Sequence, residues 1–171
     1  MIRRVAVGLV AVGIAAAMTI GHQVGLKAAL TPAGAACKLT GTATLTPGVT
    51  IKAAAVSYTF TGNLANCQSS DKTLKSGVVT ASGAGKLSCG SGTSAGTANV
   101  AWNNGQSSTI SFKTTSAGSA TTISGKTTGG EFNGDTNAGA ITFTTTKPQA
   151  CLKAPGLTTL GFTGATGAGQ P

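Results

Sequence analysis

Hydrophobic and polar residues alternate in several short runs along the chain. The clearest run is 56–60, where Val56, Tyr58 and Phe60 are separated by small polar residues. Similar runs occupy 97–102, 109–113, 141–144 and the surroundings of Leu160 and Phe162. A period of two places one face of a β-strand in a core and the other in water. No amphipathic helical pattern follows residue 35, so the pattern predicts an all-β domain.

Turn signals separate the predicted strands. Asn104-Gly105 lies between two alternating runs and is the strongest hairpin signal in the chain, because both residue types accept positive φ. Further breaks are expected at 47–48, 82–83, 129–130 and 133–135. Seven to nine short strands with tight turns predict an antiparallel β-sandwich over 36–163, with a small barrel as the alternative. The Gly-rich segment 164–171 is expected to be a flexible tail.

The N-terminus has the pattern of a secretory signal peptide. Arg3 and Arg4 precede an apolar run over 5–20, which predicts a signal-peptide helix over 1–35 with cleavage after Ala35. An earlier cut after Ala17 is an alternative, as is an uncleaved membrane anchor. Two further alternatives are a twin-arginine export signal, from the arginine pair, and a lipoprotein cleavage site before Cys37.

Four cysteines lie after this segment: Cys37, Cys67, Cys89 and Cys151. Their spacing contains no C-x-x-C pair, which argues against a zinc or redox site. An exported chain meets an oxidising environment, so we predict two structural disulfides and no free thiol. Three connectivities are open. The pairing Cys37–Cys67 with Cys89–Cys151 is preferred, because the segments next to the first pair resemble the two arms of one hairpin.

The residues needed for common catalytic mechanisms are scarce. The one histidine, His22, lies in the signal segment, so the mature chain has no Ser-His-Asp triad and no Cys-His pair. Glu131 and Asp135 are the nearest approach to a carboxylate pair, and turn formation and solubility explain them adequately. We therefore expect no catalytic, cofactor-binding or metal-ligating residue and no enzymatic activity.

Nine lysines and three acidic residues remain after the signal segment, so the mature chain is basic. The lysines are scattered and no arginine accompanies them, which argues against nucleic-acid binding. A mildly positive surface favours anionic polymers of the cell envelope. The candidate interaction residues are Trp102, Glu131 and Asp135. The alternation of Trp102 with Val100 favours a core position for the indole over a sugar-stacking surface.

Six short motifs follow one another along the chain after the signal segment. They are Cys37 with Leu45-Thr46-Pro47-Gly48, Tyr58-Thr59-Phe60-Thr61-Gly62 before Cys67, Ser88-Cys89-Gly90, Val100-Ala101-Trp102, Gly130-Glu131-Phe132-Asn133-Gly134-Asp135, and Cys151 followed by Pro155-Gly156-Leu157. Together they resemble a group of small uncharacterised secreted proteins of high-GC Gram-positive bacteria. The resemblance implies an immunoglobulin-like sandwich with an extracellular or wall-associated location, and it carries over no catalytic residue.

The sequence therefore predicts a secreted or envelope-associated, non-enzymatic domain that acts by binding or structural interaction. Its partner is expected to be a cell-envelope polymer or an extracellular protein, with the membrane involved only through the signal segment. Two alternatives remain. Thr-rich strands with few charges favour a self-assembling fibre or coat subunit, and the polar segment 68–75 beside Cys67 suits the exposed loop of a protease inhibitor.

Overall fold

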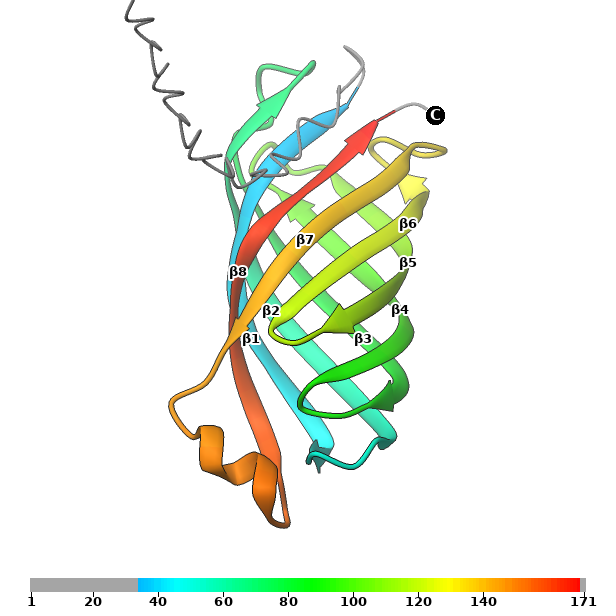
Figure 1. Ribbon diagram of the computed structural model, residues 1–171. Coiled ribbons are helices and arrows are strands. Elements are labelled where there is room, and N and C mark those ends of the chain that lie inside the picture. The colour runs from blue at the N-terminus through cyan, green and yellow to red at the C-terminus, as the bar shows by residue number, and fades with distance from the viewer. Residues whose placement is uncertain (1–33, 170–171) are drawn as a thin grey trace, which may run out of the picture.

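Eight antiparallel strands follow one another around a closed barrel in the computed structural model, which describes residues 34–169 (Figure 1). A 3-10 helix, η1, lies between the last two strands. The elements are β1 (Ala35–Val49), β2 (Ala54–Ser69), β3 (Gly77–Leu87), β4 (Ser91–Trp102), β5 (Ser107–Ala117), β6 (Ala120–Gly130), β7 (Thr136–Thr144), η1 (Pro148–Leu152) and β8 (Leu157–Gly169).

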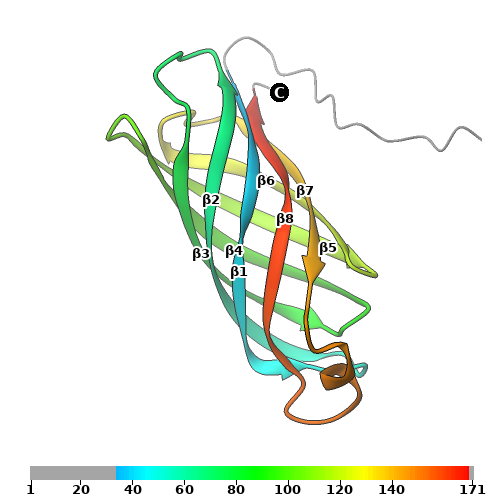
Figure 2. The same ribbon diagram turned by 90° about the vertical axis from the view of Figure 1, so that its left-hand side faces the viewer.

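The predicted sandwich is wrong, because the first and last strands pair. β1 lies between β2 and β8 (Figure 2), and its register with β8 runs from Ala35↔Ala168 to Thr44↔Thr159. An alternating strand has the same pattern in a sandwich and in a barrel, so the pattern could not decide between them. What decides is this long-range pairing, together with strands of 9 to 16 residues, which are long enough to coil around a common axis.

Closure of the barrel removes the basis for the self-assembling fibre or coat subunit. Each strand of the described chain has a partner on both sides, so residues 34–169 leave no unpaired strand edge. The self-assembly alternative relied on such edges for pairing between chains. That premise is not met in the part of the chain that the structure describes.

Inward and outward faces differ sharply in chemistry. Along β1, Leu39, Ala43 and Leu45 are buried, whereas the threonines between them are exposed. The remaining strands repeat this arrangement with Thr, Ser, Asn, Lys and small residues outside. The predicted alternation is thus confirmed, and the hydroxyl-rich outer face is suited to contact with water.

The structure of the two chain ends can be compared with the predicted limits of the domain, 36–163. Residues 1–33, which contain most of the expected signal peptide, lie outside the described residues. Ala35, the last residue before the expected cleavage, is buried and begins β1. Residues 164–169, assigned above to a flexible tail, form the end of β8 and pair with β1 and β7. Within the described range, no helix is long and apolar enough to span a bilayer.

The barrel has two ends of different construction. The closed end is made by the β2–β3, β4–β5 and β6–β7 connections, near which β1 begins and β8 ends. The open end is made by the β1–β2, β3–β4 and β5–β6 connections and the β7–β8 segment with η1 (Figure 1). The Asn104-Gly105 hairpin, as predicted, forms the β4–β5 turn at the closed end, with Gly105 at φ 84°. The break predicted at 82–83 is wrong, because Ser82 and Gly83 lie within β3 and pair with β2 and β4.

Two disulfides brace these ends, and they are the preferred pairing. Cys37–Cys67 links β1 and β2 toward the closed end, and Cys89–Cys151 joins the β3–β4 connection to η1 at the open end. No cysteine among the described residues is free.

Candidate functional site: the barrel interior

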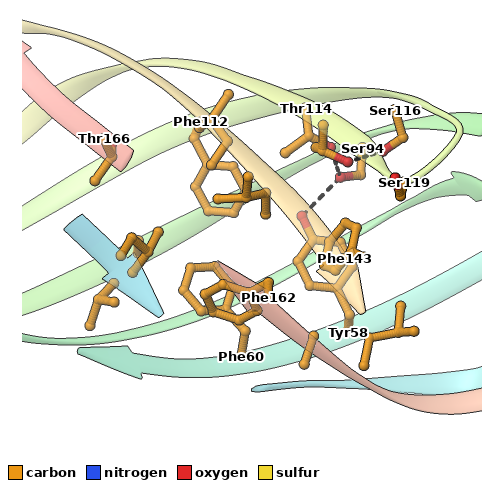
Figure 3. Close-up of a pocket in the computed structure, with 18 of the residues that line it drawn as sticks. Tyr58, Phe60, Ser94, Phe112, Thr114, Ser116, Ser119, Phe143, Phe162 and Thr166 are labelled. Atoms are coloured by element: carbon orange, nitrogen blue, oxygen red, sulfur yellow. Dashed lines mark hydrogen bonds between the residues drawn. The ribbon is translucent and has the colours of Figure 1, made fainter. Parts of the chain in front are cut away.

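The barrel encloses an apolar cavity of about 310 Å³. Four phenylalanine rings from four different strands form its middle: Phe60, Phe112, Phe143 and Phe162 (Figure 3). The Phe60 ring meets Phe162 edge-on at a centroid distance of 5.4 Å, and the Phe143 and Phe162 centroids lie 6.3 Å apart. An eight-stranded barrel is just wide enough to be filled by side chains or to hold one small ligand. Here part of the interior is left unfilled.

Inward glycines set the positions of the large rings. A Cβ at Gly41 would lie 2.7 Å from Cζ of Phe162 and closer still to the Thr61 carbonyl oxygen. A Cβ at Gly83 would lie 2.5 Å from the Tyr58 hydroxyl and 2.6 Å from the Ala95 carbonyl oxygen. Neither position tolerates a side chain without displacing the ring beside it. The glycines therefore provide the space in which the rings lie, and so determine where the cavity remains.

Aromatic packing seals the closed end. The rings of Trp102 and Phe132 meet edge-on with centroids 5.8 Å apart. Leu74, from the β2–β3 connection, is fully buried in the same hydrophobic cluster, to which the buried Cys37 and Cys67 also belong. Edge-to-face aromatic contacts add stability beyond the area they bury. The closed end is thus filled by Leu74 of the β2–β3 connection, Trp102 at the end of β4 and Phe132 of the β6–β7 connection.

Hydrogen bonds hold that seal in place. The Trp102 indole Nε1 donates to Ser108 Oγ at 2.9 Å, and the Ser108 hydroxyl donates to the Glu131 carbonyl oxygen at 2.7 Å. Close by on β6 and β7, Asn137 Nδ2 donates to Thr127 Oγ1 at 2.9 Å. These bonds pair the side chains of Trp102, Ser108, Thr127 and Asn137, whereas Ser69 Oγ and Asp135 Oδ2 at the same end are buried without a partner.

The opposite end gives access to the cavity. The exposed residues among those lining the cavity all belong to the open end: Ser91, Gly118, Ser119, Thr144, Thr145 and Pro148. Ser91 begins β4 and Thr144 ends β7, while the others come from the β5–β6 connection and the β7–β8 segment. A molecule reaching the phenylalanine rings would therefore pass between the β5–β6 turn and η1.

Part of the open end is covered. A second hydrophobic cluster of Leu45, Val49, Val56 and Leu157 packs beneath η1, with Cys151 and Leu160 against it. Backbone hydrogen bonds connect the neighbouring turns, from Ile51 N to the Cys151 carbonyl at 3.0 Å and from Cys89 N to the Thr50 carbonyl at 2.8 Å. η1 and the β1–β2 turn thus cover one side of this end, and the opening lies between η1 and the β3–β4 and β5–β6 connections.

A chain of hydroxyl groups lines the route from this opening to the rings. Tyr58 Oη lies 2.9 Å from Ser94 Oγ, which lies 2.6 Å from Thr114 Oγ1. Figure 3 shows these groups beside Ser116 and Ser119. Two hydrogen bonds among three hydroxyl groups use two protons, so a third proton is free to be donated to a ligand.

Burial changes the acidity of the tyrosine in this chain. Desolvation raises the pKa of Tyr58, and the hydrogen bond with Ser94 partly offsets this. The phenol is therefore neutral at physiological pH. A neutral hydroxyl can both donate to and accept from an uncharged polar group.

The lining carries no charged side chain in the part of the chain that the structure describes. None of its residues is Asp, Glu, Lys, Arg or His, and its three cysteines are in disulfides. The same region contains no group of three or more His, Cys, Asp or Glu side chains placed to hold a metal ion. The site can exclude water and form hydrogen bonds with neutral groups.

The three candidate interaction residues from the sequence all lie at the closed end. Trp102 is buried in the core, as its alternation predicted, and is no surface platform. Glu131 and Asp135 belong to the β6–β7 connection. Asp135 is buried, and its Oδ2 has no hydrogen-bond partner, whereas Glu131 is half-buried. These residues support the seal and lie at the far end from the opening.

The segment 68–75, the candidate inhibitory loop, is held firmly against the barrel. Asn103 Oδ1 accepts hydrogen bonds from the backbone N–H groups of Lys75 and Ser76, and Asn103 Nδ2 donates to the Thr73 carbonyl. Asp71 accepts from the Thr73 backbone and hydroxyl, and the backbone bond is the main cause that lowers the Asp71 pKa. The loop contributes the buried Leu74 to the seal.

Sequence reasoning missed the hydroxyl chain. Tyr58 was recognised as an inward residue, but Ser94, Thr114 and Ser116 are ordinary members of a Ser- and Thr-rich chain. Their one distinguishing signal is that they occupy the inward positions of β4 and β5, where the same strands elsewhere carry Val100, Ile110 or Phe112. That signal is visible only once the strand phase is known.

No protein-family model, no curated protein and no solved structure matches this chain.

Proposed function

We propose that this chain is an exported, non-enzymatic binding protein whose barrel takes up one small, uncharged and largely apolar molecule. The observation that carries the proposal is the interior cavity of about 310 Å³, open at one end and sealed at the other. Ligand pockets in proteins are typically concave and mostly apolar, with a few convergent polar groups. The phenylalanine rings provide the apolar part, and the chain from Tyr58 to Thr114 provides the polar groups.

The uncharged lining supports this ligand class. Transfer of a charged group into an apolar interior is costly unless an opposite charge meets it. Among residues 34–169, none that lines the cavity offers such a charge, whereas the Tyr58–Ser94–Thr114 chain can bond a hydroxyl, carbonyl or amide. We therefore expect neutral amphiphiles to bind and fatty-acid anions or ammonium ions of similar size to be disfavoured.

The two disulfides support an extracellular location, since such bonds persist in oxidising environments. The nine lysines of the described chain are all exposed, which keeps a positive outer surface compatible with an anionic cell envelope. We propose a secreted or envelope-associated protein that carries or buffers an apolar molecule outside the cell.

The test uses N-phenyl-1-naphthylamine, an uncharged probe whose fluorescence rises in apolar surroundings. The folded protein is expected to bind it saturably with one site. Ile123→Trp places a large ring into the cavity, because Ile123 is an inward, half-buried lining residue, and is expected to weaken binding about tenfold or more.

The matched control is Ser124→Trp, which adds the same ring at the exposed neighbour on β6. It is expected to bind the probe like the unaltered protein. Equal binding by Ile123→Trp and Ser124→Trp, with both variants folded by circular dichroism, would contradict a binding site inside the barrel. So would a complete lack of probe binding.

A further inference from the structure

Two large hydrophobic side chains project from the open end. Ile51, in the β1–β2 turn, is 69% exposed, and Leu152, at the end of η1, is 66% exposed. The Ile51 backbone N–H donates to the carbonyl of Cys151, the residue before Leu152, so the two segments are held together. Val78, on the outer face of β3, is the other large exposed hydrophobic residue of the described chain, at 48%.

Cations surround these two side chains. Lys52 follows Ile51 directly, Lys153 follows Leu152 directly, and Lys147 precedes η1; all three are exposed. The three acidic residues of the whole chain are Asp71, Glu131 and Asp135, and they lie in the β2–β3 and β6–β7 connections at the closed end. The open end therefore carries apolar tips and positive charge with no acidic residue to offset them.

The cavity opens at this same end. Pro148 and Cys151 of η1 line the cavity, and Leu152 and Lys153 come next in the chain. A surface that docked on the exposed residues would thus also face the opening. For an apolar ligand, such a contact shortens or removes the passage through water.

We infer that the open end, defined here by Ile51, Lys52, Lys147, Leu152 and Lys153, docks on an anionic lipid bilayer. Ile51 and Leu152 enter the boundary between headgroups and acyl chains, and the lysines lie against headgroup phosphates. Peripheral binding of this kind combines buried apolar area with attraction to anionic lipids. The flexible alkyl stems of the lysines allow the ammonium groups to reach the phosphates while the tips are inserted.

The combination of groups favours a bilayer over an anionic wall polymer. A hydrated polyanion would need the lysines alone and would leave Ile51 and Leu152 in water. A bilayer uses both. The inference goes beyond the proposed function, because vesicle binding is measured without any ligand in the cavity.

The experiment is flotation of the protein recovered after export with vesicles of equimolar phosphatidylglycerol and phosphatidylcholine. Binding is expected at low salt, and pure phosphatidylcholine vesicles are expected to bind far less. The double variant Ile51→Ser/Leu152→Ser and the triple variant Lys52→Gln/Lys147→Gln/Lys153→Gln are each expected to reduce binding roughly tenfold or more.

The chain offers matched controls for both changes. Val78→Ser removes an exposed hydrophobic side chain elsewhere, and Lys38→Gln/Lys72→Gln/Lys75→Gln removes three exposed charges nearer the closed end. Both are expected to bind vesicles like the unaltered protein. Equal loss in controls and test variants would overturn the proposed face. Loss in the lysine variant alone, with Ile51→Ser/Leu152→Ser unaffected, would overturn the bilayer in favour of a polyanion.

A spectroscopic measurement tests the same face without removing binding. Ile51→Trp is expected to shift its emission to shorter wavelength on phosphatidylglycerol vesicles and to be quenched by brominated lipids. Val78→Trp, with the same background from Trp102, is expected to show neither change. Identical responses of the two variants would contradict insertion at the open end.

Discussion

The indole of Trp102 meets the ring of Phe132 edge-on, with centroids 5.8 Å apart, and this contact closes one end of the barrel. The two residues come from β4 and from the β6–β7 connection, on either side of β5. The seal makes the interior a cavity with one opening rather than a channel.

Removal of the indole should weaken the closed end strongly. Trp102→Ala is expected to lower the free energy of unfolding by about 3–5 kcal/mol, because it leaves a void in a buried cluster. Urea denaturation followed by far-ultraviolet circular dichroism measures this loss. Thr97→Ala, on the exposed face of the same strand, should change the unfolding free energy by about 0.5 kcal/mol or less. Comparable losses in the two variants would contradict the seal.

Gly83 is predicted to be essential for the position of Tyr58. Gly83→Ala places a methyl group against the tyrosine hydroxyl, so the unfolding free energy should fall by about 1–3 kcal/mol and N-phenyl-1-naphthylamine binding should weaken. Gly90→Ala is the control, since a Cβ there meets no atom within 4 Å. The prediction fails if thermal melts and probe titrations do not distinguish the two variants.

Tyr58 is the one tyrosine in the chain, so its titration can be followed by absorbance at the phenolate band. Burial raises the pKa of Tyr58, and we expect the folded protein to ionise at higher pH than the unfolded protein. Ser94→Ala removes the hydrogen bond that lowers this pKa and should raise it further. An unchanged or lower midpoint in Ser94→Ala would contradict the hydroxyl chain.

The same shift has a consequence for stability. Because the folded pKa is raised, the Tyr58 contribution to stability is present in full below the unfolded pKa of about 10 and is lost as the pH rises through the folded pKa. Tyr58→Phe should lose less stability than the unaltered protein over that alkaline range. Parallel stability curves for the two proteins would refute this contribution.

The disulfide at the open end is expected to stabilise the fold by closing a long loop. Cys89→Ala/Cys151→Ala should lower the unfolding free energy by about 4 kcal/mol, given the sequence separation of 62. Denaturation with and without a reducing agent provides the comparison. If reduction destabilised the double variant as much as the unaltered protein, the effect would belong to Cys37–Cys67.

The inward face of each strand, one hairpin turn and the cysteine pairing could be predicted from the sequence. Alternation around Val56, Tyr58 and Phe60 determined which side chains are inward, and Asn104-Gly105 marked a real hairpin. The preferred cysteine pairing was also confirmed. Strand period and turn geometry are properties of neighbouring residues, and the β1–β2 hairpin brings Cys37 to Cys67. Cys89 and Cys151, 62 residues apart, are then the remaining pair.

The closure of the barrel and its cavity depended on the tertiary structure. Whether β1 pairs with β8 depends on the accumulated twist and tilt of eight strands, and no single segment encodes that sum. The cavity, in turn, depends on which inward positions of different strands face each other, such as Gly83 beside Tyr58 and Ser94 beside Thr114. The sequence by itself determined a disulfide-braced β domain with one apolar face on each strand. Only the closed barrel decided that these faces enclose a space instead of filling it.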